Sequence, residues 1–193
     1  MKTWRQNERQ RLLAARAALS AEQHHQIAQA CLNYISAYLS ECEPGILGMY
    51  WPIKKELDCR PLAAALIKSG WVLTVPVINE ETRKLEFARW QPDMPMVTGI
   101  WNIPVPEEPE WLTPSRFLVP LVGFDKANYR LGYGGGYYDR TLADMAEPVE
   151  TIGVGMELGR FETIHPQEWD IPMHHIITEA GIQIAEPQSS FDL

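Results

Sequence analysis

The stretch RLGYGGGYYDR, residues 130–140, combines residue types that can bind an anion. It places four glycines, three tyrosines, two arginines and one aspartate in eleven positions. Glycine permits positive backbone φ angles and lets backbone N–H groups approach an anion closely. A helix expected to begin at Tyr137 would add the partial positive charge of its N-terminus. Phosphate is therefore the natural ligand, although a tight turn without a ligand would also use glycines.

Two common phosphate-binding motifs do not fit this segment. GxxxxGK[ST] is absent because no Lys-Ser or Lys-Thr pair follows a glycine, and GxGxxG fails because Tyr137 stands where its last glycine should be. Asp139 lies in the first turn of the expected helix, where it could cap the helix or hold Mg²⁺ against a phosphate. Asp170, in EWDIP, is a second candidate carboxylate from a separate loop.

Other catalytic chemistries find little support in the sequence. A GxSxG nucleophile elbow is absent. The pairs His24-His25 and His174-His175 are adjacent, so their members do not share a helix or strand face and do not favour a zinc site. His165, before a proline, is interpreted as a helix-start residue rather than a catalytic base.

The N-terminal segment concentrates positive charge in an acidic protein. The net charge is −8, yet five of the 17 Lys and Arg residues fall within the first sixteen positions. In a helix, Arg5, Arg9 and Arg16 would lie within roughly 40° of one another, on a single face. That face could bind a small polyanion, or it could simply be solvated. The acidic balance argues against a nucleic-acid partner.

Length and composition indicate one cytoplasmic domain. The chain has 193 residues and a mass of 22.0 kDa, with 46% hydrophobic and 22% charged residues. No apolar run approaches the roughly 20 residues needed to span a bilayer, so no membrane partner is expected. The N-terminus is too polar for a secretory signal. Three cysteines without CxxC spacing do not favour a disulfide framework.

Alternating patterns predict an α/β fold, a three-layer α/β/α arrangement with a mostly parallel sheet. In such sheets, ligands bind where strand carboxyl ends meet helix N-termini. The segment 91–114, rich in proline and tryptophan, is expected to be an ordered loop that lines a binding site through Trp101 or Trp111. The tail at 187–193 is expected to be flexible. Helices are predicted at 3–19, 21–40, 59–70 and 137–146, a helical turn at 165–170, and strands at 46–51, 71–78, 85–90, 116–124, 150–156 and 174–179.

With these residues assembled, the chain resembles the 5-formyltetrahydrofolate cyclo-ligase family. The resemblance runs from about Arg5 to Glu179, and its most specific element is VPLVGFDKANYRLGYGGGYYDR. RLLAARAALSAE, MYWPIKKELD and QEWDIPMHHIITE support it in order and spacing. It implies an ATP- and Mg²⁺-dependent conversion of 5-formyltetrahydrofolate to 5,10-methenyltetrahydrofolate. The implied partners are therefore small molecules, and a monomer or weak homodimer is expected.

The resemblance also implies residue roles. It assigns catalysis to Arg130, Tyr137 and Asp139, and magnesium binding to Asp139 and Asp170. The implied ATP-binding residues are Arg5, Arg9, Arg130, Leu131, Gly132, Tyr133, Gly134, Gly135, Gly136, Tyr137 and Tyr138. The implied substrate-binding residues are Trp51, Glu56, Tyr133, Gly134, Gly135, Gly136 and Tyr137. Trp51 could equally be a core residue.

Three departures from the family pattern bear on this interpretation. Asn128 replaces a usual glycine, but asparagine is the next best residue for a left-handed turn. Gly159 and Arg160 form an apparent insertion where a glutamine is common, and Trp169 replaces a frequent histidine. The insertion motivates an alternative hypothesis, a non-catalytic relative or one of altered specificity that binds nucleotide or folate.

Overall fold

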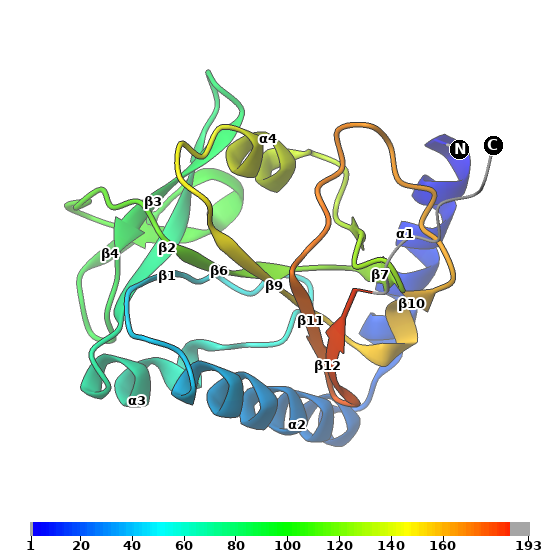
Figure 1. Cartoon of the computed structure of the whole chain (residues 1–193), viewed down its shortest axis with the longest axis horizontal. Coiled ribbons are helices and arrows are strands. Elements are labelled where there is room, and N and C mark those ends of the chain that lie inside the picture. Colours follow the sequence, from blue (N-terminus) through cyan, green and yellow to red (C-terminus); the bar gives the residue numbers. More distant parts are fainter. Residues whose placement is uncertain (1, 186–193) are drawn as a thin grey trace.

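A seven-stranded sheet forms the centre of this computed structural model, which describes residues 2–185 (Figure 1). In spatial order its strands are β12 (Gly181–Ile184), β11 (His175–Thr178), β9 (Glu150–Val154), β6 (Arg116–Pro120), β1 (Ile46–Gly48), β2 (Val72–Asn79) and β3 (Lys84–Arg89). All pairs from β11 to β2 are parallel, whereas the outer pairs β11–β12 and β2–β3 are antiparallel. The prediction of a mostly parallel sheet is confirmed.

Helices cover both faces of this sheet. Within residues 2–185 the four α-helices are α1 (Lys2–Ala18), α2 (Ala21–Ser40), α3 (Ala63–Lys68) and α4 (Tyr137–Ala143). Helices α2 and α3 lie on one face, where they contact β11 and β2, and α4 lies on the other against β3 (Figure 1). Helix α1 stands at the side of the sheet, beside β7 and β10. The three-layer α/β/α prediction is confirmed, and all layers belong to one domain.

Two small sheets complete the part of the fold that the structure describes. A three-stranded sheet has the order β10 (Arg160–Phe161), β7 (Gly123–Asp125) and β8 (Arg130–Leu131). A two-stranded antiparallel hairpin consists of β4 (Met96–Thr98) and β5 (Pro104–Pro106). Short 3-10 turns occupy residues 60–62, 100–102 and 157–159.

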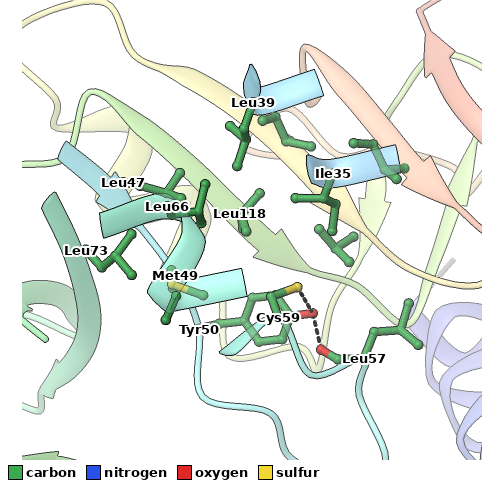
Figure 2. Close-up of a cluster of buried hydrophobic side chains, with 14 of the residues drawn as sticks. Ile35, Leu39, Leu47, Met49, Tyr50, Leu57, Cys59, Leu66, Leu73 and Leu118 are labelled. Atoms are coloured by element: carbon green, nitrogen blue, oxygen red, sulfur yellow. Dashed lines mark hydrogen bonds between the residues drawn. The ribbon is translucent and has the colours of Figure 1, made fainter. Parts of the chain in front are cut away.

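The core between α2, α3 and the sheet follows from the sequence pattern. Helix α2 begins at a capping box, in which Ser20 accepts from the backbone N–H of Gln23 and the Gln23 side chain accepts from that of Ser20. The buried residues of α2 repeat at four-residue spacing and therefore share one face. The cluster in Figure 2 joins this face to the sheet through Ile35, Leu39, Leu47, Met49, Leu66, Leu73 and Leu118.

Several predicted boundaries were wrong. The predicted strand 116–124 divides after Pro120, because the chain turns there to pair β7 with β8 and β10. The predicted loop 91–114 contains the hairpin β4–β5, and the edge strand β12 was missed. Residues 165–170 contain one turn, closed by a hydrogen bond from the Asp170 N–H to the Gln167 carbonyl, and no helix. His165 has a left-handed φ of 53°, so it does not start a helix as predicted. The tail at 187–193 lies outside the described residues.

Asn128 adopts the left-handed conformation that its place in the sequence predicts. Its φ is 63°, and its side chain is fully buried. The side-chain amide donates to the carbonyl of His174 over 3.1 Å and accepts from Gln183 over 2.6 Å. A glycine could adopt the same turn but could not make these two bonds, so the asparagine also ties the β7–β8 turn to β11 and β12.

Candidate active site

One cavity of about 630 Å³ opens at the carboxyl ends of β1, β2 and β6, where a parallel sheet is expected to bind its ligands. One part of its wall comes from α1, the 130–139 segment and the 167–170 turn. That part carries Lys2, Arg5, Arg9, Arg130, Asp139 and Asp170. The remaining wall, from residues 50–56, β2, β3 and the β4–β5 hairpin, is mostly aliphatic and aromatic. Such a cavity can bind an anionic group and an apolar group side by side.

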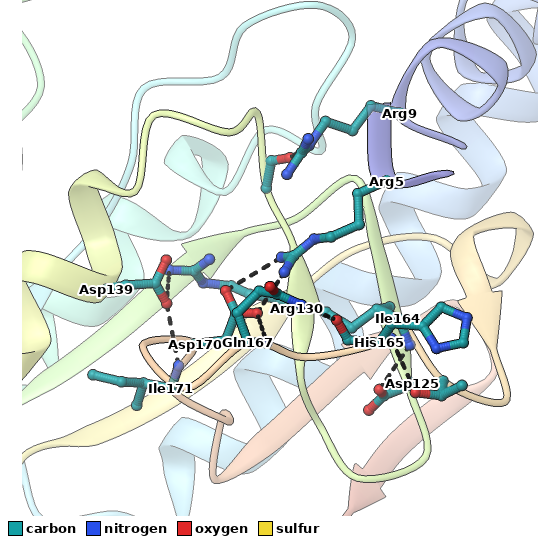
Figure 3. Close-up of polar contacts among 12 residues, drawn as sticks. Arg5, Arg9, Asp125, Arg130, Asp139, Ile164, His165, Gln167, Asp170 and Ile171 are labelled. Carbon is teal, nitrogen blue, oxygen red and sulfur yellow. Dashed lines mark hydrogen bonds and ion pairs between the residues drawn. The ribbon is translucent and has the colours of Figure 1, made fainter. Parts of the chain in front are cut away.

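Arg5 and Asp170 form a nearly buried ion pair at the charged wall (Figure 3). Arg5 Nη1 donates to Asp170 Oδ2 over 2.6 Å, and Nη2 donates to Oδ1 over 3.2 Å. The backbone N–H of Gln167 also donates to Oδ2, over 2.7 Å. This bidentate geometry fixes the planes of both groups and fastens α1 to the 167–170 turn.

Arg130 and Asp139 form the second ion pair of this wall, across 3.2 Å (Figure 3). Asp139 lies in the first turn of α4, and its Oδ1 also accepts from the backbone N–H of Ile171 over 3.2 Å. Arg130 is 6% exposed, and its Nε has no hydrogen-bond partner within residues 2–185. A buried donor without a partner favours the binding of an acceptor at this position.

Arg9 lies against the glycine loop, residues 132–136. Its Nε donates to the carbonyl of Gly132 over 2.6 Å. Burial, and then the nearby charge of Arg5, lower the pKa of Arg9. The guanidinium groups of Arg5 and Arg9 repel each other, and an anion bound between them would relieve that repulsion. Their geometry therefore supports the prediction that this face of α1 binds a small polyanion.

Two glycines of the loop have conformations that other residues rarely adopt. Gly134 has a φ of +96° and Gly136 a φ of +67°. A Cβ atom at position 134 would also lie 3.3 Å from the guanidinium carbon of Arg9. Bare backbone at this point is therefore required both by the turn and by the close approach of Arg9.

Glu56 places a buried carboxylate in the cavity wall. The side chain is 6% exposed, and its Oε2 accepts from the backbone N–H of Ile53 over 2.8 Å. Oε1 is buried without a hydrogen-bond partner within residues 2–185. Burial raises the pKa of Glu56 to about 7. With Oε1 unpartnered, Glu56 is suited to accept hydrogen bonds from a ligand in the cavity.

The turn that carries Glu56 is fastened to the end of α1. Lys55 Nζ donates to the carbonyls of Ala17 and Leu19, over 2.7 and 3.2 Å. A lysine at these positions satisfies carbonyls that the helix end leaves without partners. The same helix that carries the arginines therefore also holds the turn of Glu56.

Trp51 is both a packing residue and a wall residue. It packs edge-to-face on Trp90 at 5.9 Å between ring centroids, and the Arg60 guanidinium lies 4.3 Å from its ring centroid. Its remaining surface lines the cavity. Trp101 also lines the cavity and packs edge-to-face on Tyr137, whereas Trp111 pairs its backbone with Ala88 at the sheet edge.

The structure brings nearly all of the predicted site residues to this cavity. Leu131 is the exception, because its side chain packs in a core cluster with Leu12, Val122 and Ile164. Segment 91–114 contributes to the cavity through Trp101, as predicted, but the site residues named from the sequence did not include Lys2, Tyr50, Gln167 and Trp169. Proximity in sequence to Arg5 and Asp170 could have indicated three of these. The sequence pattern did not indicate that this segment forms a hairpin, because one of its two strands, β5, contains two prolines.

The carboxylates of Asp139 and Asp170 offer a partial fit to a magnesium ion. Within residues 2–185 no group of three or more His, Cys, Asp or Glu side chains could hold a metal. Magnesium, however, often takes only one or two carboxylates and completes its shell with phosphate and water oxygens. Both oxygens of Asp170 are held by Arg5, whereas no hydrogen bond from residues 2–185 reaches Oδ2 of Asp139. Asp139 therefore fits the ion better.

These features together are typical of an α/β enzyme that binds an anion beside an apolar ligand. No helix within residues 2–185 is both long and apolar enough to cross a membrane. The chain belongs to the 5-formyltetrahydrofolate cyclo-ligase family, whose family model matches residues 1–179. The predicted family, and with it the prediction of an enzyme, is confirmed.

Individual relatives agree with this membership. The chain is 29% identical over 186 residues to the 5-formyltetrahydrofolate cyclo-ligase of Haemophilus influenzae, a match that covers 90% of this chain and 96% of that protein. It is 28% identical over 174 residues to the protein of the same name from Escherichia coli strain K12, covering 86% and 96%.

Solved structures share the fold. The 5,10-methenyltetrahydrofolate synthetase of Aquifex aeolicus superposes with a TM-score of 0.81 at 27% identity, covering 98% of this chain and 96% of that chain. The synthetase of Mycoplasma pneumoniae gives a TM-score of 0.75 at 25% identity, covering 91% and 98%.

The buried carboxyl of Glu56 generates a stability prediction. Its folded-state pKa of about 7 exceeds that of an exposed glutamate, roughly 4.3, so the folded protein holds the proton more tightly. The contribution of Glu56 to stability is therefore present below about pH 4.3 and is lost as the pH rises through about 7. Glu56→Gln is expected to raise the free energy of unfolding by on the order of 2 kcal/mol near pH 8.

Urea unfolding of the wild type and Glu56→Gln at about pH 5 and pH 8 measures this effect. The difference between the two proteins should shrink at the lower pH, where the wild-type carboxyl is neutral as well. An equal difference at both pH values would contradict the buried, raised pKa.

Proposed function

We propose that this protein converts 5-formyltetrahydrofolate to 5,10-methenyltetrahydrofolate with ATP as co-substrate, releasing ADP and phosphate. The observation that carries the proposal is a single cavity in which an arginine–aspartate wall and an apolar, aromatic wall meet at the glycine loop. A reaction that moves a phosphoryl group from a nucleotide to a planar heterocycle needs both ligands in one cavity.

The chemistry requires activation of the formyl oxygen. An N-formyl group is an amide, and its oxygen is a poor leaving group. The formyl oxygen attacks the γ-phosphorus, the bond to the bridging oxygen breaks, and ADP leaves. N10 then attacks the formyl carbon, the carbon–oxygen bond breaks, and phosphate carries away that oxygen while N10 gives up its proton. The enzyme's contribution is mainly to position the groups and to stabilise charge.

Arginines of the charged wall would bind the triphosphate. Arg5 and Arg9 extend from one face of α1, and Arg130 offers a buried guanidinium with a free Nε donor. Guanidinium groups bind phosphate oxygens through paired N–H bonds and keep their charge at any working pH. Backbone N–H groups of residues 131–138 would complete the phosphate site, and Leu131 would contribute through its backbone alone.

The reduced folate would occupy the apolar wall. Glu56 would accept hydrogen bonds from the pterin N–H groups through its free oxygen. Trp51 and Tyr137 offer ring surfaces for the planar pterin, and Tyr133 lines the same cavity from the glycine loop. With Arg130, Tyr137 and Asp139 in one segment, the transferred phosphoryl group would cross from the nucleotide to the folate along the glycine loop.

A magnesium ion would be held by Asp139, with Asp170 beside it. When bound, it would neutralise charge on the transferring phosphoryl group. Asp139 would direct its free Oδ2 to the ion while Oδ1 stays on the N–H of Ile171, so the ligand is oriented before binding. Arg5 would have to share Asp170 with the ion.

The alternative of a non-catalytic or altered-specificity relative is not favoured. Gly159 approaches the backbone of Val122 and Gly123 closely, and Arg160 contacts Glu157, Gln183 and Phe124. The apparent insertion therefore contributes to the β7–β10 region rather than to the cavity wall.

The direct test mixes purified protein with 5-formyltetrahydrofolate and Mg-ATP and follows the methenyl product by absorbance. Product should form only when both substrates are present, with one ADP released per product. Release of ADP without the methenyl product, or no product at all, would refute the proposed reaction.

Arg9→Ala should raise the KM for ATP by about tenfold or more while changing the KM for folate less, because one charge-assisted contact to phosphate is lost. Arg11→Ala is the matched control. Arg11 lies on the same helix, but its side chain is 56% exposed and pairs with Glu8. Steady-state kinetics with each substrate varied decides the assignment, which fails if only the folate KM moves.

Asp139→Asn should lower kcat by about 100-fold or more, because it removes a fixed charge from the phosphoryl-transfer site. Asp144→Asn, at the far end of the same helix and paired with Lys84, serves as control. Titration of each variant with Mg²⁺ in the presence of ATP supplies a second readout. Near-normal turnover with unchanged magnesium dependence would exclude the metal-binding role.

A further inference from the structure

Arg16 is a buried guanidinium behind the glycine loop that the proposed reaction does not use. It is 2% exposed and does not belong to the cavity wall. Nη2 donates to the carbonyl of Leu121 over 2.7 Å, and Nη1 donates to the hydroxyl of Tyr133 over 3.3 Å. Arg16 therefore contacts, from behind, a tyrosine whose other side forms part of the cavity.

Keeping this charge buried is costly. A guanidinium cannot lose its proton in a protein, and its Nε here lacks a hydrogen-bond partner within residues 2–185. Replacing a buried charged group by an apolar side chain of similar size is often neutral or stabilising, so packing alone does not explain an arginine at this position. Arg16 contacts Leu121, just after β6, and Tyr133 of the glycine loop. Both segments border the cavity, so a role for Arg16 is expected there.

Tyr133 and Glu56 are the groups in the cavity wall that this charge can influence. Tyr133 is one-third exposed, and the Lys54 ammonium lies 5.1 Å from its ring centroid. Burial raises the pKa of Glu56, and the backbone N–H of Ile53, the Tyr133 hydroxyl and the charge of Arg16 each lower it by less. Among residues 2–185, the groups that interact electrostatically with Glu56 include Arg16, Lys54, Tyr50, Cys59, Tyr133 and Tyr138.

We propose that Arg16 is a positioning residue for the folate: from behind the glycine loop it holds the Tyr133 hydroxyl in place, in the same cavity wall that carries Glu56. The proposal rests on the proposed function, because the folate is the ligand that Glu56 would bind. Arg16 does not touch the substrate. It acts through Tyr133, which lines the cavity from the glycine loop.

Arg16→Met and Tyr133→Phe test the proposal separately and together. Each is expected to raise the KM for 5-formyltetrahydrofolate by about tenfold, the effect of one hydrogen bond involving a charged group. The KM for ATP should change less. The double variant should be no worse than the more affected single variant, because both changes remove the same link. Additive losses, or equal changes in both KM values, would overturn the proposal.

A pH profile gives a readout that a packing role would not change. In the wild type, kcat/KM for folate should fall as the pH drops and Glu56 is protonated. Loss of the Arg16 charge should move this acidic limb to higher pH by about one unit, and Arg16→Lys should restore it. Arg11→Met, on the exposed face of the same helix, should leave the limb in place. An unmoved limb in Arg16→Met would refute the charge effect.

Two further measurements separate the possible failures. Thermal unfolding shows whether Arg16→Met is folded. If it is not, the pH profile of Tyr133→Phe, which changes only a partly exposed hydroxyl, still decides whether the limb moves. Absence of methenyl product in the wild type would refute the proposed function itself. A wild type that turns over while both variants keep its folate KM and pH profile would refute the role of Arg16 alone.

Discussion

The docking of helix α1 through its arginines is the interaction on which the site depends. Arg5, Arg9 and Arg16 bind acceptors that lie 165, 123 and 105 positions further along the chain. Because a guanidinium keeps its charge, each buried arginine must find an acceptor, and these acceptors are available only when the sheet and the glycine loop are formed. Assembly of the cavity and docking of the first helix are therefore one event, in which the polar partners determine where the helix lies.

The same pairs prepare the charged wall for chemistry. Asp170 is held by an arginine and by a backbone N–H, and Asp139 is held in the same way from two directions. A carboxylate fixed along two directions cannot rotate freely, so little reorganisation is needed when phosphate and metal arrive. Opposite charges also lower the cost of gathering arginines into one wall, because unpaired cations in a partly buried cavity would repel one another.

Features that depend on neighbouring residues, such as helices and turns, could be predicted from the sequence. Features that depend on contacts between distant segments could not. Helices α1 and α2 follow from periodicity and from the Ser20 cap, and the left-handed turn at Asn128 follows from its residue type. The alignment of three arginines on one face could be calculated from helical geometry. Their partners could not, because no local pattern identifies Asp170 or the carbonyl of Leu121. The β4–β5 hairpin escaped prediction for the same reason, since its prolines disfavour strands and only tertiary pairing forms it.

The 53–56 turn shows how a binding function can be maintained against stability. Lys54 and Lys55 have left-handed φ angles of 47° and 57°, which long side chains rarely adopt. The same four residues carry Glu56, a buried acid whose free oxygen has no partner within residues 2–185. Strain, a desolvated carboxyl and an unsatisfied acceptor each destabilise the fold, and α1 offsets part of that cost by accepting the Lys55 ammonium. A glutamine or an apolar residue at position 56 would make the fold more stable. The glutamate is therefore best explained by a ligand whose N–H groups donate hydrogen bonds to its unpartnered oxygen.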